Sequence, residues 1–397
     1  MNTFRHLSVL VSLIALTVAC NDDNGSTTPD DAGIDDIGHD DANIIDAAPD
    51  ANSNAATDAK STDVEPDEDP LDAWPGQEID AEPFDVDWDM PESDDGLRFL
   101  VANVGNVDIM RCGNVAFNMC WTEQEKIVAE EIAARDADVI LLQEVLTTEQ
   151  CDALDDDDVD DDHVCHSSYA PDEPEQARRL VGDDYTIACD AQQGWECVAT
   201  RVGAVSIVGC QDGQFCRDFA RTNAPIDGCD PGFTVSAVTI EFDDRLLDVV
   251  NVHPPSDAPG TEDPQQCRHD YFQTFFDDDA PLIEEDKVLV AGDFNFDPYR
   301  QSEDNPDVAI WHEFVSTSFE QTRDDRLTFA YHSGLPEHNP PYFTTPILDR
   351  TLDHAISNGL YGRCITLGAQ PGEAPLDRAK GHPIEQLDHF ALECVLN

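Results

Sequence analysis

The sequence has few basic residues. Its 397 residues include 21 lysines and arginines against 85 aspartates and glutamates, and the formal net charge is −64. Residues 21–95 hold 26 acidic residues and one lysine, whereas residues 96–397 hold 59 acidic and 19 basic residues, so both parts are acidic. Such a surface repels polyanions, and tight non-specific binding to DNA is disfavoured unless bound cations intervene. Adaptation to a salty environment explains the same composition equally well.

The sequence also lacks the short motifs of several enzyme classes. It contains no P-loop, no G-x-S-x-G elbow and no H-E-x-x-H pair, so kinase, serine-esterase and zinc-protease activities have no support. No C-x-x-C pair occurs, which weakens zinc-finger and thioredoxin-like interpretations. The acidic run from Asp155 to His163 lacks the glycine and spacing of an EF-hand loop. We expect that run to be a solvated insertion.

No apolar run is long enough to span a bilayer. The longest, Leu7 to Val18, follows Arg5 and His6 and precedes Cys20, which is typical of a signal peptide. The letters LTVAC resemble the lipobox of bacterial lipoproteins, in which the cysteine is acylated. Thr17 stands where an aliphatic residue is commoner, and an ordinary secretory signal is the alternative. We therefore expect an exported lipoprotein of the outer membrane or cell surface, or a secreted protein, with residues 1–20 as signal and a lipid anchor on Cys20.

Composition predicts two further regions. Residues 21–95 are rich in Asp, Ala, Asn, Pro and Thr, and such a segment cannot bury enough apolar surface to offset the entropy of ordering. We predict an acidic disordered tether there and a folded domain over residues 96–397. Twelve of the 13 cysteines fall between Cys112 and Cys394, an even number that indicates disulfides and an oxidising compartment. Sequence proximity suggests three local bridges, Cys112/Cys120, Cys189/Cys197 and Cys210/Cys216.

Several apolar runs in the folded region read as strands, and one helix stands between them. Thr122 to Glu125 has the spacing of a capping box, and residues 127–134 continue with helical periodicity. Gly203–Gly209 and Phe233–Phe242 are predicted strands, and Asp243 and Asp244 are predicted to form a hairpin turn.

The run Val288–Pro298, VLVAGDFNFDP, places polar residues where a buried strand stops. Alone, it is well explained by a polar turn that Gly292 makes and Asp293 and Asn295 cap. Other apolar runs also stop at polar residues, however, and a carboxylate such as Glu144 in an apolar run is costly to bury without a partner. The residues at these strand ends are, in chain order, Asn103, Glu144, His253, Asp293 with Asn295, Asp353, and Asp388 with His389.

These motifs resemble the endonuclease/exonuclease/phosphatase family, the metal-dependent phosphoesterases with the deoxyribonuclease I-like fold. The likeness extends from Leu97 to Leu396 and rests on the order and spacing of the strand ends. Two departures stand out: Leu387 replaces the serine that usually opens the final motif, and Pro254 and Pro255 follow His253 where leucine is usual. The resemblance implies a four-layered α/β sandwich, with two mostly antiparallel sheets flanked by helices and the site at one end.

The resemblance also implies a role for each residue. Glu144 would be the principal metal ligand, with Asn103 and Asp388 nearby, and the metal would be Mg²⁺, with Mn²⁺ or Ca²⁺ as alternatives. Asp293 would orient or deprotonate the attacking water, and Asn295 would donate to a phosphate oxygen. His389 would contact the scissile phosphate, with its tautomer fixed by Asp353, and His253 would act at the leaving group or phosphate. Arg221 is the candidate for the family's phosphate-binding arginine.

The expected function is hydrolysis of phosphodiester bonds by a nuclease or related phosphodiesterase, acting as a monomer on a phosphate-ester substrate such as a nucleic acid, a nucleotide or a phospholipid head group. A phosphatase of nucleotides or phosphosugars and a phospholipid phosphodiesterase are alternatives, because specificity resides in loops. A surface binding module that kept the fold and lost the chemistry is the alternative from another class. The completeness of the polar set favours an enzyme.

Overall fold

The computed structural model describes residues 96–105, 119–154, 159–190, 195–217, 221–222, 226, 229, 233–256, 263–276, 282–298, 305–316, 329–333, 351–367 and 389–397. The predicted signal peptide, the tether, Cys112 and Asp388 lie outside these residues. Within the described ranges, no helix has the length and apolar character needed to cross a membrane.

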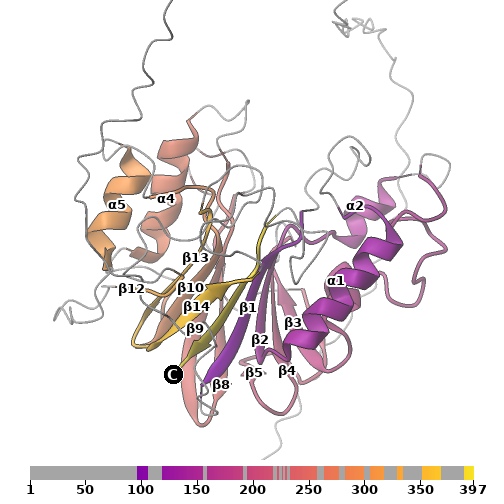
Figure 1. The fold of residues 1–397 in the computed structure, drawn as a ribbon, viewed down its shortest axis with the longest axis horizontal. Coiled ribbons are helices and arrows are strands. Elements are labelled where there is room, and N and C mark those ends of the chain that lie inside the picture. Colours follow the sequence, from indigo (N-terminus) through magenta and orange to yellow (C-terminus); the bar gives the residue numbers. More distant parts are fainter. Residues whose placement is uncertain are drawn as a thin grey trace, which may run out of the picture. The chain divides into compact units, whose positions relative to one another are not determined.

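Two mixed β-sheets form the centre of the fold (Figure 1). The first sheet has the order β14 (Gly362–Thr366), β15 (Leu392–Leu396), β1 (Leu97–Asn103), β2 (Val139–Gln143), β4 (Cys197–Arg201), β3 (Tyr185–Cys189) and β6 (Phe215–Cys216). The second has the order β11 (Val315–Ser316), β12 (Phe329–Tyr331), β13 (Asp353–Asn358), β10 (Val288–Asp293), β9 (Arg245–Val252), β8 (Ser236–Phe242) and β5 (Ser206–Ile207), with β7 (Arg221–Thr222) also paired to β8.

Helices cover the outer face of each sheet (Figure 1). The first sheet carries α1 (Thr122–Arg135), α2 (Thr148–Asp152) and α3 (Gln176–Val181) on its side, and the second carries α4 (Pro264–Phe276) and α5 (Pro306–Phe314). Most strand pairs are antiparallel, and the central pairs β1/β2 and β9/β10 are parallel. The predicted four-layered α/β sandwich is confirmed.

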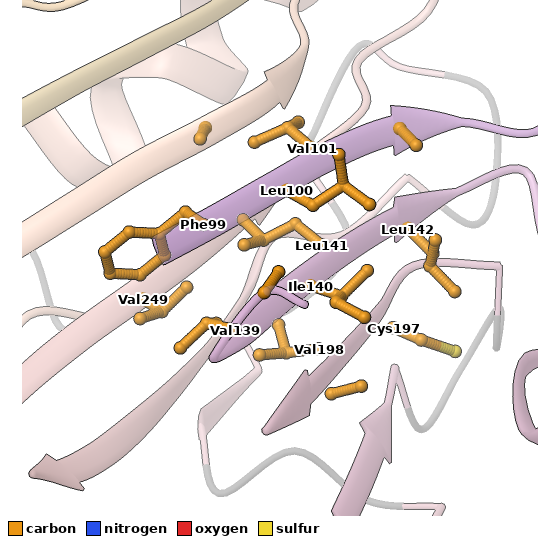
Figure 2. Packing of buried hydrophobic residues seen from close by; sticks show 14 of the residues in the cluster. Phe99, Leu100, Val101, Val139, Ile140, Leu141, Leu142, Cys197, Val198 and Val249 are labelled. Carbon is orange, nitrogen blue, oxygen red and sulfur yellow. The ribbon is translucent and has the colours of Figure 1, made fainter. Parts of the chain in front are cut away.

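The side chains of the central strands point alternately to the two faces of the sheet, and their packing on both faces holds the layers together. Leu289 and Ala291 of β10 point into the core between the sheets, whereas Val288 and Val290 point into a second core beneath α4 and α5. Side chains of β1 and β2 pack against Val249 of β9 in the first of these cores (Figure 2). Because both faces of the central strands are covered, these strands are continuous apolar runs rather than alternating ones.

Two local predictions have definite outcomes. Asp243 and Asp244 have φ values of 49° and 59°, and they connect β8 to β9 as the predicted hairpin turn, in which both central residues are left-handed. The predicted capping box at Thr122 is wrong by one residue. The cap is Trp121, whose main-chain N–H donates to Oε1 of Gln124 at 3.1 Å. Glu125 instead turns inward and pairs with Arg179 of α3 at 2.6 Å.

Five disulfides join described cysteines. The predicted local bridges Cys189–Cys197 and Cys210–Cys216 are confirmed. The others are Cys151–Cys165, Cys229–Cys267 and Cys364–Cys394. In the acidic insertion, Asp160, Asp161 and Asp162 are exposed as predicted. His163 is not solvated, because it is buried in a bridge to Trp121.

Candidate active site

The predicted polar residues meet at one end of the two sheets because of strand direction. The parallel pairs β1/β2 and β9/β10 both finish at this end, so Asn103, Glu144, His253 and Asp293 arrive at carboxyl ends of strands. β13 and β15 run antiparallel to these strands and start here, which places Asp353 and His389 at the same edge. Asp353 is directly opposite Asp293 in the β10/β13 register. Six strands from two sheets thus bring the predicted residues to one site.

Asn103 ties the two sheets together at the centre of the site. Its Nδ2 donates to Oε1 of Glu144 at 3.1 Å and to Oδ2 of Asp293 at 3.0 Å, so one amide links carboxylates from β2 and β10. Its Oδ1 accepts from the main-chain N–H of Gly105 at 2.9 Å, which fixes the orientation of the amide. Asn103 therefore presents hydrogens, rather than its oxygen, to the two carboxylates.

His253 lies between two carboxylates. Its Nε2 is 3.3 Å from Glu144 Oε1 and its Nδ1 is 3.4 Å from Glu196 Oε1, while Asp293 Oδ2 is 4.0 Å from Nε2. Burial alone would lower the pKa of His253, but the contacts with Glu144 and Glu196 raise it well above its usual value. Burial likewise opposes ionisation of Glu144, and contact with His253 leaves the pKa of Glu144 lowered.

Glu196 is a member of the cluster that the sequence did not reveal. It directly precedes β4, which is antiparallel to β2, so the start of β4 reaches the same edge as the end of β2. Burial raises the pKa of Glu196 despite its contact with His253. The available signal was a carboxylate immediately before the apolar run Cys197–Thr200. That signal has meaning only once the pairing of β2 with β4 is known.

His389 and Asp353 form a second imidazole–carboxylate pair. Nδ1 of His389 is 2.7 Å from Asp353 Oδ2, and its Nε2 is 3.7 Å from Asp293 Oδ2. This geometry puts a hydrogen on Nδ1 and turns Nε2 towards the interior of the site. Burial raises the pKa of Asp293, Asp353 adds to the effect by repulsion, and the two histidines oppose it. Asp293 is thus a carboxylate with increased proton affinity, held between two imidazoles.

The turn after β10 is built around a glycine. Gly292 has φ +147°, and a Cβ there would lie 2.1 Å from the carbonyl oxygen of Val252. The main-chain N–H of Asn295 donates to Asp293 Oδ1 at 2.7 Å, and Asn295 itself is left-handed with φ 52°. One amide hydrogen of Asn295 is donated to the carbonyl oxygen of Pro254 at 2.9 Å. The turn therefore has the structural role that the sequence suggested, and it also holds Asp293 within the cluster.

The chemistry of the donor set fits a divalent cation. Two groups have ligand atoms mutually within 4.8 Å: Glu144, His253 and Asp293, and Asp293, Asp353 and His389. Three carboxylates crowd into a largely buried volume, and the raised pKa of Asp293 shows the cost of ionising it there. A cation would offset that repulsion, and carboxylate oxygens are the ligands that Mg²⁺ prefers.

One predicted residue, Arg221, lies away from this cluster. Arg221 forms an ion pair with Asp248, and its Nη2 donates to Thr239 Oγ1 at 2.9 Å. Asp248 is opposite Val288, at the other end of β10 from Asp293, so the structure does not bring Arg221 to the site. Arg221 is opposite Ala237 of β8, and its side chain extends along the sheet to Asp248 and Thr239, away from the cluster. Asp388 lies outside the described residues.

The chain is similar to proteins of known sequence and structure. The sequence model of the Endonuclease/Exonuclease/phosphatase family matches residues 114–368. The human Nocturnin catalytic domain with bound sulfate has 15% identity, covers 76% of this chain and 94% of its own, and gives a TM-score of 0.44. Humanized D. rerio TDP2 has 13% identity with coverages of 76% and 99% and a TM-score of 0.46. A family protein from Leptotrichia buccalis has 17% identity with coverages of 76% and 100% and a TM-score of 0.41. A comparison with curated proteins found no match.

Proposed function

The chain belongs to the endonuclease/exonuclease/phosphatase family, whose members are phosphoesterase hydrolases, and from this premise we propose that it is a divalent-metal-dependent hydrolase of phosphodiester bonds, a nuclease or a related phosphodiesterase. One observation carries the proposal: Asn103 joins Glu144 to Asp293 within a cluster that also holds two carboxylate-paired histidines. A binding module without chemistry has no need for this complete set.

Each side chain has a role that follows from its surroundings. Asp293, with its raised pKa, accepts the proton of the attacking water. Nε2 of His389, set by the Asp353 contact, faces the phosphoryl group, and the second amide hydrogen of Asn295 donates to one of its oxygens. His253, which its two carboxylates keep protonated, donates towards the leaving oxygen. Glu144 would hold the cation with the predicted ligand Asp388, whereas Asn103, whose amide hydrogens face Glu144 and Asp293, would orient these carboxylates. A bound divalent ion would stabilise the charge on the phosphoryl oxygens.

The test is hydrolysis of a generic phosphodiester, bis-p-nitrophenyl phosphate, by the purified chain with and without Mg²⁺. Double-stranded DNA, RNA, nucleotides and sphingomyelin assayed in parallel separate nuclease from phosphatase and phospholipid activities. Asp293→Ala should reduce kcat by about 10²- to 10⁴-fold, because it removes the proton acceptor. Asp161→Ala, at a fully exposed acidic position that makes no contact with the cluster residues, is the matched control. Undetectable activity, or an Asp293→Ala variant as active as the control, would refute the proposal.

The proposal places this activity outside the cytoplasm. The LTVAC motif supports acylation at Cys20, and five disulfides in the described part support an oxidising compartment. The expected result is that the full-length protein, produced in a bacterium, fractionates with membranes. A Cys20→Ser variant should appear in the soluble fraction. Equal membrane association of both proteins would argue against the anchor.

A further inference from the structure

The segment that follows β9, His253-Pro254-Pro255, is held by side chains from outside it. The main-chain N–H of His253 donates to the hydroxyl of Tyr271 at 3.1 Å. The carbonyl oxygen of Pro254 accepts from Asn295 at 2.9 Å, and that of Pro255 accepts from Nη1 of Arg268 at 3.2 Å. The two prolines have no N–H and a fixed φ, so the segment has little freedom of its own. Its position is therefore set by three side chains.

Two of those side chains come from one face of α4. Arg268 and Tyr271 are three residues apart, a spacing that puts side chains on the same side of a helix. Both are buried, with relative exposures of 0% and 1%. The preceding residue, Cys267, is bonded to Cys229, which fixes the start of the helix. Helix α4 thus presents two anchored polar groups to the end of a catalytic strand.

The anchoring of Arg268 extends to α5. Its Nε donates to Asp307 Oδ2 at 2.9 Å, and both side chains are fully buried. Asp307 lies in the first turn of α5, where the helix dipole favours a negative charge, and its Oδ1 accepts from the N–H of Val308 at 2.9 Å. The charge of Arg268 is thereby balanced within the protein, which leaves Nη1 for the carbonyl of Pro255. The ion pair makes Arg268 a rigid support.

We propose that Tyr271 and Arg268 are positioning residues for the reaction, which act by fixing the main chain on both sides of His253. The proposal rests on the proposed function. The imidazole of His253 contacts Glu144 at 3.3 Å on one side and Glu196 at 3.4 Å on the other, so a small main-chain shift removes it from one partner. Displacement of a reacting group by about 1 Å can reduce a rate by about 100-fold. The hydroxyl of Tyr271 and the guanidinium of Arg268 prevent that displacement.

The first experiment compares Tyr271→Phe with Tyr185→Phe. Both tyrosines are buried, and each hydroxyl forms one hydrogen bond to the main chain; that of Tyr185 donates to the carbonyl of Ala137 at 2.7 Å, at the opposite end of the sheet. Both variants should lose similar thermal stability. Tyr271→Phe should lower kcat by about 10- to 100-fold with KM changed less than about twofold, whereas Tyr185→Phe should retain wild-type kinetics. Equal kinetics for the two variants would overturn the proposal.

A second measurement is independent of activity. Hydrogen exchange at the His253 amide reports the bond to Tyr271, and the two prolines that follow contribute no exchanging amide to the same peptide. Exchange there should be at least about tenfold faster in Tyr271→Phe than in wild type, and unchanged in Tyr185→Phe. Unchanged exchange in Tyr271→Phe would show that the hydroxyl of Tyr271 does not hold the main chain at His253. If the wild-type chain hydrolyses no phosphodiester, the proposed function fails, and the exchange result alone decides whether Tyr271 fixes the main chain at His253.

Arg268 is tested by a conservative change. Arg268→Lys keeps a cation beside Asp307 but cannot also reach Pro255, so it should reduce kcat while the protein stays folded. Arg178→Lys is the control, because Arg178 is also buried and donates to the carbonyl oxygens of Gly182 and Tyr185 in a region remote from the site. A loss of stability without a kcat effect specific to Arg268→Lys would show that Arg268 only supports the fold.

Discussion

Replacement of Gly292 by alanine should damage both stability and catalysis. The new Cβ would lie 2.1 Å from the carbonyl oxygen of Val252 and 3.0 Å from its carbonyl carbon and its nitrogen. Gly292 and Val252 are register partners in the β9/β10 ladder, so the overlap can be relieved only if the two strands separate. His253 and Asp293 are the next residues on these strands. A shift that relieves the overlap therefore moves both of them.

The magnitude follows from two contributions. Overpacking a rigid interior costs about 1–3 kcal/mol, and a side chain at a positive φ costs about 1–3 kcal/mol more. A substitution at Gly182 allows the overpacking and backbone contributions to be measured separately, because Gly182 has φ +81° and a Cβ added there would meet no atom within 4 Å. Gly182→Ala therefore has the backbone strain alone. We expect Gly292→Ala to exceed Gly182→Ala by about 1–3 kcal/mol in lost free energy of unfolding.

Urea unfolding followed by tryptophan fluorescence measures the stability of both variants, and phosphodiester hydrolysis at 25 °C measures their activity. Gly292→Ala should lose about 100-fold in kcat, because its reacting groups are displaced, whereas Gly182→Ala should keep wild-type activity. The steric reasoning is refuted if the two variants are equally destabilised and equally active.

Three further predictions concern pH, orientation and cross-linking. Burial lowers the pKa of His332 from 6.5 to about 4, so its contribution to stability is complete above pH 6.5 and is lost as the pH falls towards 4. At pH 5 the loss of unfolding free energy is about 2 kcal/mol. The His332→Gln variant should lack this part of the pH dependence in urea titrations. Glu196→Gln should lower kcat by about 10-fold or more in steady-state assays, because His253 loses a charged partner. Replacing Cys229 and Cys267 with serine should cost about 4 kcal/mol of unfolding free energy in the chain-entropy account, since their bridge closes a loop of 38 residues.

The sequence was sufficient for the strands and for most of the residues at their ends. Continuous apolar runs such as Val288–Ala291 predict buried strands. In the structure, the polar residues at the ends of these runs lie together in the candidate site. Strand direction did not need to be known for this. Carboxyl ends of parallel strands and amino ends of antiparallel ones look alike in sequence, as polar residues beside an apolar run.

Features that depend on pairing and register could not be predicted. Glu196 belongs to the site only because β4 is antiparallel to β2, and Arg221 is directed elsewhere because Asp248 and Thr239 bind its guanidinium. The start of α1 shows the same principle at short range. Glu125 has the right spacing for a cap, but Arg179, far away in sequence, holds it in the interior, and Gln124 takes the capping position instead. Tertiary partners decided these three outcomes.

The pairing of β1 with β15 joins two segments that are synthesised far apart in time. Leu97 and Leu396 are neighbours in the first sheet, and His389 directly precedes β15. A ribosome adding about 5–20 residues per second needs on the order of 15–60 s between these two strands. Throughout that interval Asn103 and Glu144 are already synthesised, but the imidazole that faces Asp293 is not. In the proposed mechanism, a chain that lacks β15 therefore also lacks the imidazole of His389, whose Nε2 is 3.7 Å from Asp293 Oδ2.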